Sequence, residues 1–280
     1  MQLEVAVTQE KTNRSKKELK DVGFALPVGI SDSAGKLHKG FAFKPWRLKE
    51  EKELGELKKE LEDARMPTYI SAVLSTMLTR VGQHDFTKMD KTQKGLALTQ
   101  MYTADIFYMY IMLRKENVSH ELKLDFGCPH CGRKIKFVGD LNTVDVVCVD
   151  DLAALDCEYE LTTPINIRGK ETKKLSLTAL KWNTYEMLTD KHINEGNAIE
   201  YFLLNSIVGS DVQENMLVLA EDELDELVKN DYAALSDLVT ENTPGPEMAI
   251  ETLCTNIGCK EKVFVRIEWE KHSFFEHSSQ

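Results

Sequence analysis

Two cysteine pairs, one near the middle of the chain and one near its end, constrain the fold of this sequence more than any other feature. The first pair is Cys128-Pro129-His130-Cys131, followed by Gly132, and the second is Cys254 and Cys259, with Gly258 just before the second thiol. Thiolate pairs on tight turns are typical ligands of a tetrahedral zinc site, and glycine tolerates the sharp turns that such a site needs. We therefore predict that Cys128, Cys131, Cys254 and Cys259 bind one structural zinc ion.

Strand patterns surround both pairs. Residues 122–126 alternate between apolar and polar before the first pair, residues 134–138 alternate after it, and residues 263–269 alternate after the second pair. A strand, a turn with two cysteines and a second strand form half of a zinc ribbon. Compact zinc ribbons place their pairs much closer in sequence, so either this ribbon carries a large insertion or the two pairs are unrelated.

The rest of the chain mixes strand and helix patterns. Residues 22–48 have the pattern of a β-hairpin around a polar turn at 31–35. Apolar residues at helical spacing predict helices over about 48–61, 68–81, 91–113, 182–206, 221–228 and 232–239. We expect an α+β fold, in which an N-terminal β-hairpin and helical block is joined to a zinc-ribbon-like β module that carries a large mixed α/β insertion.

These patterns also predict a domain organisation. The lysine-rich run 11–20 belongs to a flexible N-terminal segment, residues 1–21. A hairpin plus helical domain follows over residues 22–121. The zinc-ribbon-like domain then occupies residues 122–280, with inserted strands and helices over about 140–253.

Charge and hydropathy exclude several classes of protein. The chain has 35 Lys and Arg against 46 Asp and Glu, a formal charge of −11, whereas binding to nucleic acid needs a concentrated basic surface. The most apolar window, 106–113, is too short to span a bilayer and predicts a buried helix. No secretion signal opens the chain, and six cysteines fit a reducing compartment. We expect a soluble intracellular protein without a nucleic-acid partner or a membrane span.

The Cys128-Pro129-His130-Cys131 motif has a second interpretation, a thiol-disulfide oxidoreductase with Cys128 as nucleophile and Cys131 as resolving thiol. Such enzymes place the first thiol at a helix N-terminus, which lowers its pKa. Residues 132–137 alternate like a strand instead, so this interpretation is the alternative. A zinc-ribbon nucleic-acid binder is a third hypothesis, and the acidic charge disfavours it.

The remaining candidates have simpler interpretations. Cys148 and Cys157 lie among strand residues and are expected to be core thiols, and His130 is expected to face solvent. The acidic stretch 221–227 has leucines at helical spacing and predicts a solvated helix surface. No phosphate-binding loop, dinucleotide fingerprint, nucleophile elbow or metalloprotease helix is present in the sequence, so we predict a protein that is not an enzyme.

Several short segments between roughly residues 22 and 277 resemble one protein family. They are Leu26-Pro27-Val28-Gly29, residues 35–39, residues 43–51, Phe126-Gly127-Cys128-Pro129-His130-Cys131-Gly132, Leu161-Thr162-Thr163-Pro164, the pair Cys254 and Cys259, and Phe274-Phe275. With these segments the chain resembles the tail and baseplate assembly proteins of contractile-tailed phages and related injection systems, including the T4-type baseplate hub assembly family. The segment around Cys128 matches the CPxCG motif of that family.

The resemblance implies a role without catalytic residues, in which the protein organises or joins the central hub and baseplate through contacts with other tail and baseplate hub proteins. It implies a location in the host cytoplasm during assembly, and in the virion baseplate if the protein stays there. A transient assembly chaperone and a permanent structural part both fit, and no oligomeric state is implied. Phe274-Phe275 is either an anchor for a partner or a lid on the ribbon. The lysine-rich N-terminal extension and the longer spacing of the second cysteine pair depart from the family pattern.

Overall fold

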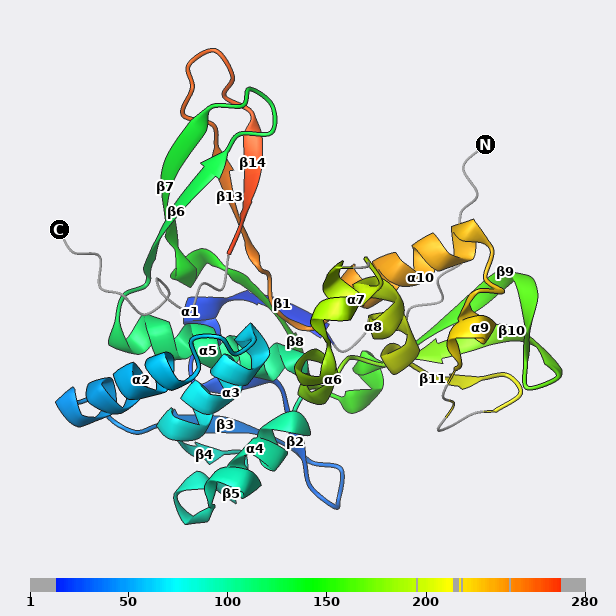
Figure 1. Ribbon diagram of the computed structural model, residues 1–280, viewed down its shortest axis with the longest axis horizontal. Coiled ribbons are helices and arrows are strands. Elements are labelled where there is room, and N and C mark those ends of the chain that lie inside the picture. Colours follow the sequence, from blue (N-terminus) through cyan, green and yellow to red (C-terminus); the bar gives the residue numbers. More distant parts are fainter. Residues whose placement is uncertain (1–13, 195, 214–216, 218, 242, 268–280) are drawn as a thin grey trace. The chain divides into compact units, whose positions relative to one another are not determined.

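The computed structural model describes residues 14–194, 196–213, 217, 219–241 and 243–267 (Figure 1). Their packing forms two compact units. The inserted unit contains Arg14, Thr99–Thr103 and Val149–Pro244, and the flanking unit contains Ser15–Leu98, Ala104–Cys148 and the described residues from Gly245 onwards. Helices and antiparallel sheets occur in both units, so the α+β class is confirmed. The domain boundaries at residues 21 and 121 stay predictions, because compact packing does not show which segments fold independently.

The expected N-terminal hairpin is present in the flanking unit. Strand β2 (Ala25–Ser31) pairs with β3 (Leu37–Phe43), and β4 (Leu78–Val81) and β5 (His84–Asp85) extend them to a sheet of order β2-β3-β4-β5. Strand β4 lies where the sequence predicts the end of a helix. The helix ends at Met77 because Leu78–Val81 pair with the edge of β3 as an antiparallel strand.

Four helices belong to the same stretch of the chain as this sheet. They are α2 (Leu48–Glu60), α3 (Met66–Met77), α4 (Lys91–Thr99) and α5 (Thr103–Asn117). The sequence predicts one helix over 91–113, but the structure has two, interrupted at residues 100–102. There Tyr102 forms an isolated β-bridge with Lys181, and the N–H of Trp182 donates to the carbonyl of Met101. The apolar window 106–113 lies in helix α5, and its residues are buried except Phe107, which is partly exposed.

Residues 14–22 are ordered by pairing and burial. Arg14–Glu18 forms strand β1 in a sheet of order β1-β8-β12, with β8 (Asp145–Val149) and β12 (Gly245–Pro246). Leu19–Val22 forms helix α1, and Leu19 is fully buried. The predicted flexible segment covers residues 14–21 of this stretch. The lysine-rich sequence carries no local signal of one buried leucine or of a strand whose partner is distant in sequence. Residues 1–13 lie outside the described residues.

The zinc-ribbon-like module consists of two antiparallel hairpins. Strand β6 (Glu121–Gly127) pairs with β7 (Lys134–Asp140), and β13 (Ala249–Leu253) pairs with β14 (Lys262–Arg266) (Figure 1). Both pairings keep an unbroken register. The hairpins pack so closely that a Cβ atom on Gly139 would lie 2.6 Å from Cδ1 of Ile250. The segment between the hairpins contains the strands and helices of the inserted unit, as the sequence predicts.

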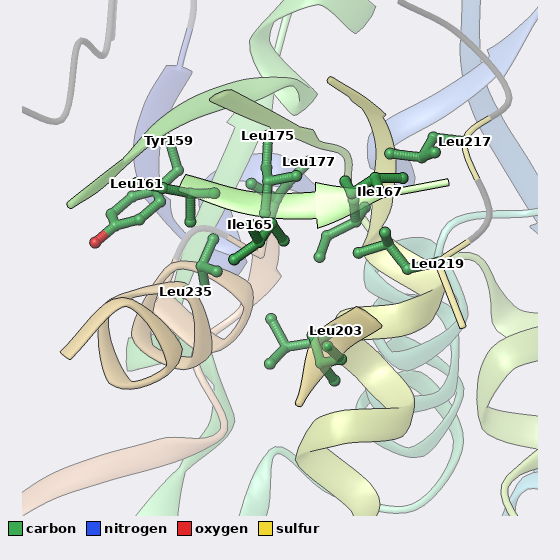
Figure 2. Close-up of a cluster of buried hydrophobic side chains, with 12 residues drawn as sticks. Tyr159, Leu161, Ile165, Ile167, Leu175, Leu177, Leu203, Leu217, Leu219 and Leu235 are labelled. Carbon is green, nitrogen blue, oxygen red and sulfur yellow. The ribbon is translucent and has the colours of Figure 1, made fainter. Parts of the chain in front are cut away.

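The inserted unit has a three-stranded sheet of order β11-β10-β9, formed by β9 (Cys157–Ile167), β10 (Lys170–Leu177) and β11 (Ile207–Ser210). Its helices are α6 (Trp182–Met187), α7 (Asp190–Asn194), α8 (Ala198–Ser206), α9 (Glu221–Leu224) and α10 (Lys229–Glu241). Figure 2 shows side chains of β9 and β10 gathered against Leu203 of α8 and Leu235 of α10. Short 3-10 helices lie at Phe86–Lys88, Leu141–Thr143 and Leu152–Leu155.

One buried aspartate near the start of a helix supports a distorted strand in each unit. In the flanking unit, the carboxylate of Asp105 on α5 accepts hydrogen bonds from the N–H groups of Val28 (2.8 Å) and Gly29 (2.9 Å) in the irregular part of β2. In the inserted unit, Asp231 on α10 accepts from the N–H (3.0 Å) and hydroxyl (2.9 Å) of Thr162 in the irregular part of β9. These bonds satisfy backbone groups that cannot join a regular ladder.

Candidate metal centre

The two cysteine pairs meet at the tips of the two hairpins. The sulfur atoms of Cys128, Cys131, Cys254 and Cys259 all lie within 4.8 Å of one another. The Cys128 sulfur is 3.9 Å from the Cys259 sulfur, and the Cys131 sulfur is 3.8 Å from the Cys254 sulfur. Members of the first pair therefore face members of the second pair, although 131 and 123 residues of sequence separate them.

Backbone hydrogen bonds form the first turn. The N–H of Cys128 donates to the carbonyl of Arg133 (3.0 Å), and the N–H of Gly132 donates to the carbonyl of Cys128 (2.8 Å). Gly132 has a φ of 69°, a left-handed conformation that glycine adopts without steric cost. The sequence thus predicts the role of Gly132 correctly, because the turn between β6 and β7 requires this conformation.

The second turn is built differently from the first. The N–H of Cys254 donates to the carbonyl of Glu261 (2.9 Å), and the N–H groups of Cys259 (2.9 Å) and Lys260 (3.1 Å) both donate to the carbonyl of Asn256. The left-handed residue is Lys260, with a φ of 56°, whereas Gly258 has no positive φ. The importance that the sequence analysis gives to Gly258 is therefore wrong, because the four residues between the cysteines move the strained position beyond the second thiol.

The four thiols have unequal surroundings. Cys128 and Cys254 are 2% and 3% exposed, Cys259 is half-buried and Cys131 is exposed. The side-chain amide of Asn256, 3.5 Å from the Cys131 sulfur, and the N–H of Arg133 lower the pKa of Cys131 to about 6. The N–H of Asn256 acts to lower the pKa of Cys254, but burial and the neighbouring thiols outweigh it and raise that pKa to about 12. Without a cation, ionisation of one thiol therefore opposes ionisation of its neighbours.

The donor set fits one tetrahedral metal ion. Zinc–sulfur bonds of about 2.3 Å in a tetrahedron place the sulfurs about 3.8 Å apart. The two shorter contacts across the cluster, 3.8 and 3.9 Å, agree with this separation. Sulfurs of a disulfide lie about 2.05 Å apart, and all six cysteines of the chain are free thiols. These four thiols can hold a metal ion.

The cluster is also part of the ribbon's core. The buried residues here are Cys128, Ile135, Cys254, Val263 and Val265. Leu124, Phe126, Phe137 and Cys259 pack against them but stay partly exposed. Two of the five buried side chains of this cluster are thus candidate ligands, so the cluster's own apolar contribution to the stability of the ribbon is small.

Other candidates from the sequence lie outside this cluster. Cys148 on β8 is buried, and Cys157 at the start of β9 is half-buried against the core of the inserted unit, where burial raises its pKa. His130 is exposed between Cys128 and Cys131, as expected. Strand β7 follows the first cysteine pair, so the helix on which the redox interpretation depends is not at this position.

The acidic stretch 221–227 is more than a solvated surface. Leu224 is buried, as the helical spacing predicts, but two of the acids bind backbone. The carboxylate of Glu223 accepts from the N–H of Arg168 (2.9 Å), and that of Glu226 accepts from the N–H of Asn166 (2.7 Å). Helical periodicity alone does not predict these contacts, because they join α9 and its C-terminal extension to the end of a strand more than fifty residues earlier.

The chain matches the family model described as T4 bacteriophage base plate protein over residues 32–275. This match includes both cysteine pairs and most of both compact units. The class that it defines is that of structural proteins of the phage baseplate. The chain belongs to the T4 bacteriophage base plate protein family, which confirms the resemblance seen in the sequence.

Two further observations accompany this assignment. Comparisons with curated proteins and with solved structures found no match. Among the described residues, no helix combines the length and the apolar character needed to cross a membrane.

Proposed function

We propose that this chain is a non-enzymatic component of the baseplate hub that acts through contacts with other baseplate proteins, and that one structural zinc ion stabilises its ribbon. The family match over residues 32–275 carries the baseplate part of this proposal. The hub as the specific location rests on the short motifs that resemble the T4-type hub assembly family. The ion would be held by Cys128, Cys131, Cys254 and Cys259.

Zinc is the metal that this donor set favours. Four cysteine thiolates in tetrahedral geometry are typical of structural zinc sites, whereas calcium and magnesium prefer oxygen ligands. The cross-pair sulfur distances of 3.8 and 3.9 Å support a single ion at the centre of the cluster. Four protein ligands leave no open coordination position for water, so such an ion stabilises the fold and does not catalyse a reaction.

The surroundings of the other buried ionisable groups support a non-enzymatic role. The carboxylates of Asp105 and Asp231 are fully buried and bind backbone N–H groups of neighbouring strands. Groups that are held in this way support the fold and have no access to a substrate. The oxidoreductase alternative, with Cys128 as nucleophile, is weaker because each thiol of its motif faces a thiol of the other pair.

Native mass spectrometry of the purified full chain, with and without a denaturing chelator step, tests the metal. We expect one zinc ion per chain, lost only together with the fold, because metal binding and folding are coupled in such sites. A chain without zinc that contains a Cys128–Cys131 disulfide would contradict the proposal and favour the oxidoreductase.

Co-expression with the hub and other baseplate proteins, followed by affinity purification, tests the proposed role. We expect a stable complex with at least one hub protein, and the absence of any complex would contradict the proposal. Peptide mapping of mature particles then separates two forms of the role. A permanent part is present in the particles, whereas a factor that acts in the host cytoplasm only during assembly is absent from them.

A further inference from the structure

An open groove lies along the ribbon, between β14 and the β6–β7 hairpin. Its volume is about 880 Å³. The apolar side chains that line it are Leu122, Leu124, Phe126, Phe137, Val263 and Val265, together with the exposed Val138 and Phe264. Phe264 is 65% exposed and Val138 is 52% exposed. Of the inner side chains, Leu124, Phe126 and Phe137 stay partly exposed. Together with Val138 and Phe264 they offer an apolar surface to another segment.

The strands beside this groove have edges that can accept a further strand. Among the described strands, β6 pairs only with β7, and β14 pairs only with β13. The groove is lined by residues of β6 and β14 but by none of β13. An edge strand carries unpaired N–H and C=O groups, and an extended peptide that pairs with them gains affinity from backbone hydrogen bonds.

The charges of the groove indicate which segment would bind. Its charged side chains are Lys123, Lys136 and Arg266 against a single acid, Asp125. The two hairpins, residues 121–140 and 249–267, contain seven Lys and Arg against five Asp and Glu. The chain as a whole is strongly acidic, and residues 149–244 alone contain 20 Asp and Glu against 7 Lys and Arg. The ribbon is thus a basic surface on an acidic protein, and it favours an acidic partner.

We propose that this groove binds an extended segment of another baseplate protein in which acidic and apolar residues alternate, added as a β-strand to the ribbon. Alternate side chains of a strand point to opposite sides. The apolar set would cover Phe126 and Phe137, and the acidic set would meet Lys123, Lys136 and Arg266. The inference rests on the proposed baseplate role and on a ribbon that is folded around its metal ion.

A labelled peptide tests this inference directly. The probe is a fluorescent peptide of about ten residues, the length of a long strand, with alternating valine and glutamate. Fluorescence anisotropy is measured with the zinc-loaded full chain. We expect this peptide to bind at least about tenfold more tightly than one with alternating valine and lysine, and to lose affinity about threefold or more as salt rises to about 0.5 M, because salt screens the charges.

Matched variants locate the binding surface. Phe264→Asp is expected to weaken binding of the valine-glutamate peptide about tenfold. Its control is Leu48→Asp on α2, because Leu48 is 67% exposed and does not line the groove. Lys136→Glu is expected to have a similar effect, with Lys49→Glu as its control. Zinc content is measured for every variant, so that loss of the fold is separated from loss of the surface.

Four results would overturn the inference. The zinc-loaded chain could fail to bind the peptide, or the groove variants could bind it as tightly as their controls. Binding that appears only after Phe274→Ser and Phe275→Ser would assign the groove to the chain's own C-terminal segment. A homodimer that the peptide dissociates would assign it to a second copy. If the Phe264→Asp chain still forms normal complexes with baseplate proteins, only this inference fails, whereas no complex with the unaltered chain contradicts the proposed function itself.

Discussion

Among the described residues, the buried cluster between the sheet and helices of the inserted unit has twelve apolar side chains, whereas the buried cluster around the thiols of the ribbon has five, of which two are cysteines. Burial of apolar surface stabilises a fold in proportion to its area, at roughly 25 cal/mol per Å². The inserted unit can therefore depend on its core, but the ribbon needs a further source of stability. This chain thus combines a region held by apolar packing with a region whose core is completed by four thiols and, as we propose, a metal ion.

The largest effect is expected from the loss of one candidate ligand, which should unfold the ribbon and leave the inserted unit folded. Cys254→Ser should destabilise the ribbon by on the order of 5 kcal/mol, because folding is coupled to metal binding at four-thiolate sites of the kind that we propose here. Hydrogen exchange should show loss of protection in β6, β7, β13 and β14 and retained protection in β9 and β10. Cys148→Ser, which changes a buried thiol outside the cluster, is the control and should leave the ribbon protected. Equal effects of the two substitutions would show that the ligands are assigned wrongly.

A substitution in the apolar core of the inserted unit should instead destabilise that unit and leave the ribbon folded. Leu235 on α10 is fully buried. It belongs to the apolar cluster of the inserted unit drawn in Figure 2. Leu235→Ala should cost about 3 to 4 kcal/mol of unfolding free energy, through lost burial and the cavity left behind. Urea denaturation measures this cost, and native mass spectrometry should still find one zinc ion per chain. A simultaneous loss of zinc would mean that the two regions do not fold separately.

The stability of the ribbon and the stability contributed by the contact between α5 and β2 should depend on pH in opposite directions. Burial raises the pKa of Asp105 to about 6, although the N–H groups of Val28 and Gly29 act to lower it. Because the folded state then binds a proton more tightly than the unfolded state, this group makes the protein less stable as pH rises from about 4 to about 6, by about 3 kcal/mol. Metal binding has the opposite dependence, because protons compete for the thiolates as pH falls.

Urea denaturation of the wild type and of Asp105→Asn across this pH range measures the contribution of Asp105. The stability of the wild type relative to the variant should fall as pH rises through the window. A difference that stays constant or grows would contradict the raised pKa of Asp105.

The smallest expected effect concerns the turns that present the thiols. Gly132→Ala should cost about 1 kcal/mol, because alanine is strained at a φ of 69°, although the space around this position is open. Gly258→Ala is a matched control, since the space there is also open and φ is not positive. Its effect on the thermal midpoint should be near zero. A larger loss for Gly258→Ala would mean that the second turn changes conformation when the metal binds.

Much of this molecule could be predicted from local sequence. The strand, cysteine turn and strand at residues 122–138 were recognisable because each feature lies within a few residues of the next. The buried helix α5 was recognisable from its unbroken apolar window. By contrast, strand β4 was missed, because its residues continue the apolar pattern of α3 and become a strand only by pairing with β3.

Polar contacts across long sequence distances were also missed. Neither the role of Asp105 at Val28 and Gly29 nor that of Asp231 at Thr162 has a signal in spacing or composition. In each case the carboxylate accepts hydrogen bonds from backbone N–H groups in an irregular stretch of strand. That irregularity exists only in the folded protein. The sequence likewise contains no local signal that the two cysteine pairs belong together.

By itself the sequence determined the types of element, the four thiols that can act as ligands and the acidic character of the chain, because each of these depends on residue identity and short-range periodicity. The tertiary structure decided that Cys128 meets Cys259 and that Cys131 meets Cys254. It also decided that an open basic groove lies beside them. The physical reason is that pairing between segments more than a hundred residues apart depends on how the whole chain packs, and no local pattern specifies it.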